Sequence, residues 1–150
     1  MKLVIVAVGR MKDRSARALL DEYYQRIRRY SSLEELEVID DRSARLADTV
    51  DRVVSAHKGR AELVALEVTG KPLNSTAFAE RVGARLESAA VPVFILGGAT
   101  GIPEALSDRA AWKLSLGPMT LPHRLARITL AEQLYRAFTI LRGEPYARED

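Results

Sequence analysis

The order of apolar runs and helical patterns constrains this chain more than any other feature of its sequence. Five short runs of mainly β-branched and aliphatic residues occupy residues 2–8, 35–39, 63–68, 91–96 and 112–116. Helical spacing follows them at residues 15–30 and 44–58, around Phe78, Val82 and Leu86, from Pro103, and over residues 124–141. Continuous apolar runs are typical of strands that are buried on both faces. The alternation predicts an α/β fold with a mainly parallel sheet flanked by helices.

Length and composition narrow the class of protein. The 150 residues suffice for one domain, 1–150, with a sizeable core, and 47% apolar with 29% charged residues excludes a disordered chain. No apolar run approaches the ~20 residues that span a bilayer, and a strand pattern begins at Lys2. We therefore expect no membrane segment and no signal peptide. The absence of cysteine excludes a disulfide framework and a thiolate nucleophile, and it is compatible with a cytoplasmic protein.

The charge is unevenly distributed. The net charge is only +3, yet the segment Arg10–Tyr30 holds seven basic residues and three acidic ones. The basic residues are Arg10, Lys12, Arg14, Arg17, Arg26, Arg28 and Arg29. A basic surface favours nucleic acid or an anionic substrate as partner, although a solvated helix face accounts for such a run equally well.

The loops after the strands are the expected ligand sites of a doubly wound sheet. Gly9 stands alone where a dinucleotide fingerprint needs three glycines, so a nicotinamide or flavin site is not favoured. Asp40 and Asp41 could bind ribose, but without the glycine loop such residues more often form turns. The glycines of Gly97–Gly101 let backbone approach a ligand at the start of a helix, although a plain tight turn is the commoner reason for them.

The loop Leu116–Pro122 lies at the end of the next strand. Together with this loop, the glycines of Gly97–Gly101 are better explained by a ligand site than by a plain tight turn. A pocket framed by Leu66, Gly98 and this loop would be mostly apolar, with main-chain donors and acceptors exposed by irregular backbone geometry. Such a pocket suits an adenine and a thioether better than a triphosphate.

The last helical stretch opens at His123. An isolated histidine there is most often solvent-exposed, but histidine is also the side chain that titrates near neutral pH. Projected at 100° per residue, the apolar residues fill roughly 200° of the helix, more than one sheet face usually covers. Either the helix is deeply buried in its own chain or a second chain packs on it, and we favour a symmetric dimer.

Two charged features lie on the same helix. Arg127 projects into the apolar arc and could reach water along its stem or meet a partner. Glu132 and Arg136 are four residues apart and could form a surface pair of ~0.3 kcal/mol, or face a substrate at a dimer seam.

Several motifs together are specific to one family. They are VAVG at residues 6–9, LEVTGKP at 66–72, FILGGATG at 94–101, MTLPH at 119–123, EQLYRAF at 132–138 and PY at 145–146. In order and spacing the chain resembles, over nearly its whole length, the RlmH family of small bacterial methyltransferases. These belong to the SPOUT superfamily and modify large-subunit ribosomal RNA.

The resemblance implies a fold, a cofactor and a substrate. It implies a SPOUT-type fold with a C-terminal trefoil knot, a homodimer, and S-adenosylmethionine bound in the knot without a metal. The matching cofactor residues are Leu66, Gly98, Leu116, Gly117, Pro118, Met119, Thr120, Leu121 and Pro122. It further implies methylation at N3 of a pseudouridine in 23S rRNA, with the assembled ribosome as substrate.

For the chemistry, the residues His123, Glu132, Arg136, Tyr146 and Arg148 are the candidates. The imide N3 must lose a proton, which His123 could take. Arg136 or Arg148 could stabilise the resulting negative charge, oriented by Glu132, and Tyr146 could stack on the base. The tail departs from the family at Ala147, where histidine is usual. Either the residue at this position is not an indispensable base, or another group of this chain takes the place of the histidine.

RNA backbone contacts are expected from Arg10, Lys12, Arg17 and Arg28. If the tail of one chain covers the pocket of another, the site is composite. Two rival functions are a non-catalytic, ribosome-associated RNA-binding protein with this fold and a flavodoxin-like nucleotide-binding enzyme.

Overall fold

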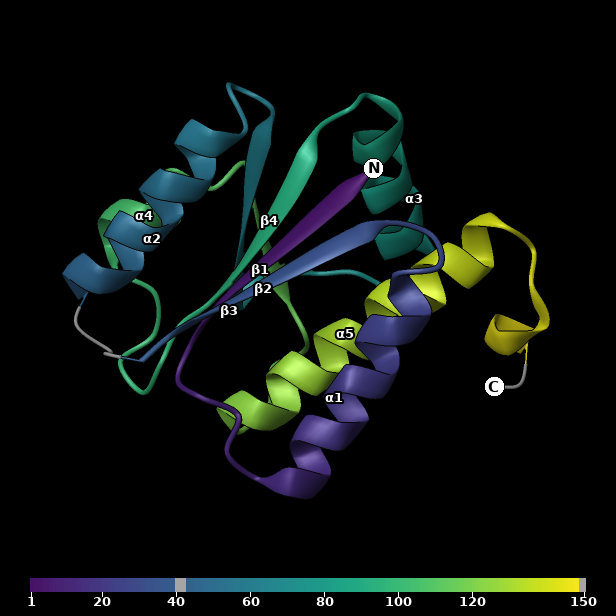
Figure 1. Ribbon diagram of the computed structural model, residues 1–150, viewed down its shortest axis with the longest axis horizontal. Helices are drawn as coiled ribbons and strands as arrows, with labels where there is room; N and C mark the ends of the chain where they lie inside the picture. Colours follow the sequence, from purple (N-terminus) through teal and green to yellow (C-terminus); the bar gives the residue numbers. More distant parts are fainter. Residues whose placement is uncertain (40–42, 149–150) are drawn as a thin grey trace.

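A twisted parallel sheet forms the centre of the computed structural model, which describes residues 1–39 and 43–148 (Figure 1). Its strands are β1 (Lys2–Val8), β2 (Ser32–Val38), β3 (Ala61–Pro72), β4 (Val91–Leu96) and β5 (Trp112–Ser115). They lie in the order β2-β1-β4-β3-β5, and every adjacent pair among the described residues is parallel. The predicted parallel α/β sheet is confirmed.

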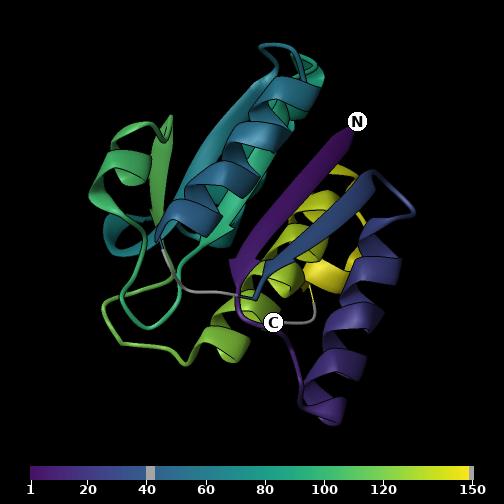
Figure 2. The same cartoon turned by 60° about the vertical axis from the view of Figure 1, so that its left-hand side comes forward.

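Helices cover both faces of this sheet. They are α1 (Arg14–Ile27), α2 (Ser43–Ala56), α3 (Ser75–Glu87), α4 (Glu104–Asp108) and α5 (His123–Leu141), followed by the 3-10 turn η1 (Pro145–Arg148). Helices α1, α3 and α5 share one core with the sheet, and α2 and α4 share the other. Figure 2 shows α2 and α4 on the opposite side of the strands from α1 and α5.

The strand β1 illustrates why the chain folds this way. Leu3 and Ile5 belong to the core beneath α1, α3 and α5, whereas Val4 and Val6 belong to the core beneath α2. Successive side chains of a strand point to opposite faces, so an uninterrupted apolar run supplies both cores at once.

Two strands differ from their predicted bounds. β2 begins at Ser32, before the predicted start at Glu35. β3 continues to Pro72, although a loop was predicted from Thr69, because the chain resumes pairing with β5 after an irregularity between Leu66 and Lys71. Asp40 and Asp41 lie outside the described residues.

Helix α5 is largely buried within its own chain. It packs between α1 and α3, and residues such as Leu130, Leu134 and Phe138 are buried in the shared core. The wide apolar arc is thus mostly covered without a second chain. Leu125 and Leu141, at the two ends of the helix, remain exposed.

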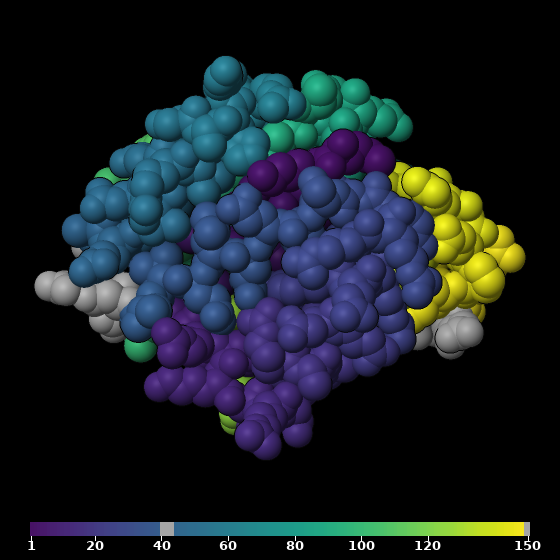
Figure 3. Space-filling view, viewed as in Figure 1, coloured from purple at the N-terminus to yellow at the C-terminus, as the bar shows by residue number. Residues whose placement is uncertain are grey.

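The C-terminal segment after α5 folds back against α5, on the side of the sheet that α1 and α5 cover. In Figure 3 its yellow atoms lie beside the blue atoms of α1 and β2. Tyr30 donates a 2.6 Å hydrogen bond to Glu144, and its ring stacks on Phe138 with centroids 5.2 Å apart. Of the described helices, none is both long enough and apolar enough to cross a membrane.

Candidate active site

A cavity of about 450 Å³ opens at the carboxyl ends of β1, β3, β4 and β5. This is the edge of a parallel sheet at which ligands are expected to bind. The β3 extension, the β4–α4 turn, the β5–α5 loop and the first turn of α5 enclose it. Most of its wall is apolar side chain or backbone, which suits a ligand with an aromatic ring and few charges.

Seven of the nine residues that the family resemblance assigned to the cofactor line this cavity. They are Leu66, Gly98, Leu116, Gly117, Met119, Thr120 and Leu121. Pro118 and Pro122, which are exposed, are not among the lining residues.

Two glycines let the backbone close tightly around the cavity. A Cβ on Gly97 would lie 2.4 Å from the carbonyl carbon of Gly101, within the β4–α4 turn. A Cβ on Gly70 would lie 2.8 Å from the backbone of Lys113, so β3 passes β5 at this point without room for a side chain. The predicted turn at Gly97–Gly101 is therefore also a wall of the pocket.

The buried hydroxyl of Ser115 links two pocket segments. It donates toward the carbonyl oxygen of Val68 at 3.0 Å and accepts from the amide of Gly117 at 3.1 Å. Gly117 has a φ of 124°, a conformation that favours glycine, where the chain leaves β5. The sequence interpretation missed Ser115 because a hydroxyl at a strand end gives no signal of its partners.

His123 is exposed at the rim of the cavity, as the first residue of α5. Its position agrees with both interpretations of the sequence, a solvated helix start and a group beside the reacting atoms.

Three of the predicted catalytic residues meet beside the middle of α5, at Glu132. Arg136 donates from Nε to Oε1 of Glu132 at 2.9 Å, and its Nη2 lies 2.8 Å from the same oxygen. Tyr146 donates to this oxygen at 3.0 Å, and the Arg136 guanidinium lies 5.0 Å from the centre of the Tyr146 ring. Both charged side chains are largely buried, at 15% and 19% exposure, so this is more than a surface pair.

Tyr146 acts as a donor in this cluster. Burial, hydrogen bonding with Tyr23 and Glu132, and the negative charge of Glu132 raise the pKa of Tyr146 above its usual value. Its hydroxyl therefore stays protonated at neutral pH. Arg148 lies apart from the cluster, where it is exposed and donates to the carbonyl oxygen of Gly143.

The cavity rim and the Glu132 cluster are separate within one chain. His123 and Glu132 are nine positions apart on a continuous helix, which corresponds to about 13 Å along its axis. Glu132, Arg136 and Tyr146 are not among the residues that line the cavity.

The predicted RNA contacts divide into two groups. Arg10 and Lys12 are exposed in the loop that follows β1, directly after the cavity residue Val8. Arg28 follows α1 at its far end, about 20 Å along the helix from its start, and donates to the carbonyl oxygen of Leu33.

Arg17, also predicted to contact RNA, makes ion pairs within the molecule. Its guanidinium donates to Asp21 at 2.7 Å and to Glu35 at 2.7 Å within the molecule. The hydrogen bond to Asp21 outweighs the effect of burial, and the pKa of Arg17 is raised. The charge of Arg17 is therefore used internally, a role that the count of basic residues could not reveal.

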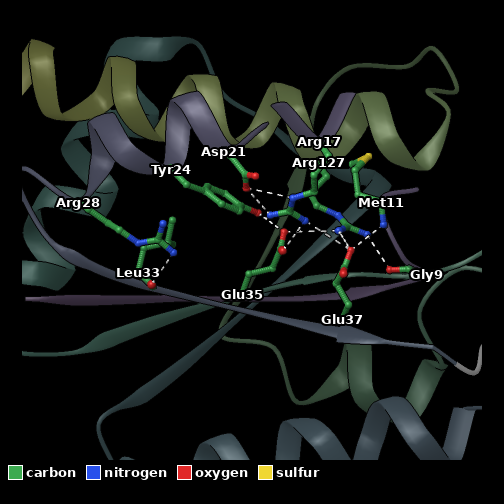
Figure 4. A network of polar contacts seen from close by, with 10 residues as sticks. All are labelled: Gly9, Met11, Arg17, Asp21, Tyr24, Arg28, Leu33, Glu35, Glu37 and Arg127. Carbon is green, nitrogen blue, oxygen red and sulfur yellow. Dashed lines mark hydrogen bonds and ion pairs between the residues drawn. The ribbon is translucent and has the colours of Figure 1, made fainter. Parts of the chain in front are cut away.

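Of the two alternatives predicted for Arg127, the structure favours the one in which it meets a partner, and the partners lie in its own chain (Figure 4). Its side chain is only 4% exposed, so it does not reach water along its stem. It donates to Glu37 at 2.6 Å and to the carbonyl oxygen of Gly9 at 3.0 Å, and it lies 3.4 Å from Glu35. The sequence did contain a signal for these partners. Glu35 and Glu37 occupy alternate positions of β2, on the face that also carries the buried Leu33.

Comparison with known proteins identifies the family. The family model described as "Predicted SPOUT methyltransferase" matches residues 1–147. The chain belongs to the SPOUT methyltransferase family. Among its relatives, the ribosomal RNA large subunit methyltransferase H of Sorangium cellulosum (strain So ce56) is 49% identical over 98% of this chain and 99% of the relative. The protein of the same name from Anaeromyxobacter sp. (strain Fw109-5) is 42% identical over 97% and 99%.

One solved structure shares the fold of this chain. A probable methylase family protein from Haemophilus influenzae Rd KW20 matches with a TM-score of 0.59 at 12% identity, over 96% of this chain and 69% of that one. At this identity the likeness shows the fold alone. Within residues 1–39 and 43–148, no group of histidine, aspartate and glutamate side chains is arranged to hold a metal ion.

Proposed function

We propose that this protein is an S-adenosylmethionine-dependent methyltransferase of 23S rRNA that acts at N3 of a pseudouridine in the assembled ribosome. The proposal rests above all on the family match over residues 1–147, together with relatives that are named for methylation of large-subunit rRNA. The cavity supports it, because it occupies the strand ends and consists of the segments assigned to the cofactor.

The cavity fits the chemistry of S-adenosylmethionine. Its volume of about 450 Å³ lies within the range of small-molecule sites. Apolar side chains such as Leu66, Leu116 and Ile102 would contact the adenine, and the backbone of Gly117 and Leu121 would bond its nitrogens. When bound, the cofactor supplies an electrophilic methyl group.

Alignment is the main task of the protein in such a transfer, since acceptor nitrogen, methyl carbon and leaving sulfur must be in line. His123, which lines the cavity at its rim, would accept the imide proton. Arg136, held by Glu132, would stabilise the negative charge that this proton loss leaves on the base. Tyr146 would contribute a ring face, with Arg148 as a further cation of the tail.

The separation along α5 supports a homodimer with a composite site. In one chain Glu132 lies about 13 Å from His123 along the axis of α5, and a second copy that brings its own cluster to the cavity would let both act. The exposed Met119 and Leu125, beside the cavity, supply apolar surface for that copy. We also propose the trefoil knot of the family, with α5 as its threaded element.

The decisive experiment is methyl transfer to ribosomes that lack the modification. Tritiated S-adenosylmethionine should label 23S rRNA with the wild type, and His123→Ala should lower the rate at least tenfold while calorimetry shows unchanged cofactor binding. Full activity of His123→Ala would remove it from the chemistry. Ribosome binding without cofactor binding would instead favour a non-catalytic RNA-binding protein.

A further inference from the structure

A buried ionic contact ties the cofactor cavity to the loop that carries Arg10 and Lys12 (Figure 4). Arg127, in the second turn of α5, lines the cavity and reaches across to β2 and to the end of β1. It is one of six buried polar or charged residues among those described. Nothing in the proposed chemistry uses it.

The contact holds the loop at both of its ends. The carbonyl oxygen of Gly9 accepts from Arg127 at 3.0 Å, and the amide of Gly9 donates to Val38 at 2.8 Å. Two residues later the amide of Met11 donates to Glu37 at 2.7 Å. Arg127 donates to the same carboxylate oxygen of Glu37 at 2.6 Å.

The loop presents two cations beside the cavity. Arg10 and Lys12 are exposed, whereas Met11 between them is buried. Neither cation has an ion-pair partner within residues 1–39 and 43–148. Anchoring Met11 on both its side chain and its amide fixes the direction in which its two neighbours point, which is away from the core.

Stability alone does not account for this contact. A buried ion pair loses much of its Coulombic gain to desolvation, and apolar residues of similar volume often stabilise a fold as well or better. The Nε atom of Arg127 also lacks a hydrogen-bond partner among the described residues, which adds to the cost. Burial opposes ionisation of Glu37, but hydrogen bonds from Arg127 and Met11 outweigh it and lower its pKa.

We propose that Arg127 and Glu37 are positioning residues for RNA binding, which hold the Gly9–Lys12 loop so that Arg10 and Lys12 contact rRNA phosphates beside the cofactor cavity. The inference rests on the proposed function and adds to it the surface that receives the RNA backbone. Phosphate is the expected partner because both cations are exposed, have no ion-pair partner among the described residues, and follow the cavity residue Val8 directly along the chain.

The test uses Glu37→Gln, because Glu37 does not line the cavity. This variant should raise the KM for unmodified ribosomes about tenfold and leave the dissociation constant for S-adenosylmethionine within about twofold. The matched control is Glu34→Gln, which removes an exposed pair with Lys2 on the same strand and should leave both values unchanged.

A double-mutant cycle separates positioning from a general loss of structure. The double variant Arg10→Ala/Lys12→Ala should raise the KM for ribosomes. It should also reduce the slope of the logarithm of the binding constant against the logarithm of the salt concentration by about one to two, which corresponds to the loss of one to two phosphate contacts. Adding Glu37→Gln to that variant should have little further effect, because the loop has no charge left to position. An equal loss in both backgrounds, or no loss in the wild-type background, would overturn the proposal.

Hydrogen exchange tests, independently of activity, whether Arg127 and Glu37 hold the Gly9–Lys12 loop, an arrangement called the clamp below. The Met11 amide should exchange at least tenfold faster in Glu37→Gln than in the wild type, with core amides of β1 unchanged. Slow exchange of Met11 in the variant would refute the clamp even if methyl transfer succeeds. Conversely, fast exchange in an enzyme that does not methylate rRNA would support the clamp and reject the proposed function. If Glu37→Gln does not fold, Glu37→Asp, which keeps the charge and shortens the reach, serves instead.

Discussion

The shape of the cavity depends on individual residues, one of them a hydroxyl side chain and one a glycine. Ser115 joins the β3 extension to the β5–α5 loop through one hydroxyl, and Gly97 lets the β4–α4 turn close on itself. Both act through backbone geometry rather than through contact with solvent. Their substitutions should therefore have different effects, on ligand affinity for the hydroxyl and on folding for the glycine.

Replacing Ser115 with alanine should weaken S-adenosylmethionine binding about three- to tenfold. The change leaves the amide of Gly117 without its acceptor and frees a pocket loop from β3. Isothermal calorimetry measures the affinity. Ser88→Ala is the control, because its hydroxyl bonds only within the end of α3, and an equal effect of both changes would contradict the role of Ser115.

Gly97→Ala should lower the free energy of unfolding by more than about 2 kcal/mol, because its Cβ would press on backbone that cannot move aside. Urea unfolding gives the value. Gly83→Ala, inside α3, provides the contrast, since its Cβ would meet only the flexible end of Leu141. Alanine also favours the helix by up to ~1 kcal/mol, so this variant should be neutral or stabilised.

The helices begin in two different ways. Asp13 and Asn74 cap α1 and α3, each accepting a 2.8 Å hydrogen bond from the amide three residues later. Pro122 precedes α5 without any side-chain cap, so the first amides of α5 remain available beside the cavity. The starts of α1 and α3 are thus capped by side chains, whereas the start of α5, which borders the cavity, is not.

Asn74→Ala should cost about 1 kcal/mol of unfolding free energy, since an amide of α3 loses its acceptor. Urea unfolding measures the loss, and Asn74→Asp should restore it. The affinity for S-adenosylmethionine should not change in either variant, because α3 does not line the cavity. A parallel loss of affinity would indicate that α3 positions the pocket.

The assembled molecule places one core on each side of the sheet and its ionic network on the side of α1 and α5 (Figure 4). Glu37, Arg127 and Arg17 connect β2, α5 and α1 across this side. Charges that bridge three elements affect the stability of the whole fold.

The contribution of Glu37 to the free energy of unfolding should depend on pH and fall in acid. The pKa of Glu37 is lowered in the folded protein, so its ionisation adds stability above its ordinary pKa of 4.5, and this is lost as the pH falls through the lower, folded pKa. Glu37→Gln should therefore be less stable than the wild type at pH 7, and the difference should narrow below pH 4.5. Urea unfolding between pH 3 and 7 measures this, and a constant difference would contradict it.

A composite dimer should show complementation between two inactive variants. His123→Ala and Tyr146→Ala, mixed and allowed to exchange subunits, should regain methyl transfer, because each mixed dimer contains one site with both wild-type groups. Each variant alone should stay at least tenfold below the wild type. If mixing restores nothing although subunits exchange, the two groups do not act across a dimer.

The sequence by itself determined the parallel α/β sheet, the succession of its elements and the strand-end loops that line the cavity. These follow from local properties: apolar runs, helical spacing, and glycines where backbone must close tightly. Only the tertiary structure decided the strand order and the partners of Arg17 and Arg127. Glu37 and Arg127 are 90 residues apart, and their contact exists only because α5 packs on the sheet face to which alternate residues of β2 point. Residue spacing reports the face of one element, whereas an ion pair depends on which two faces meet.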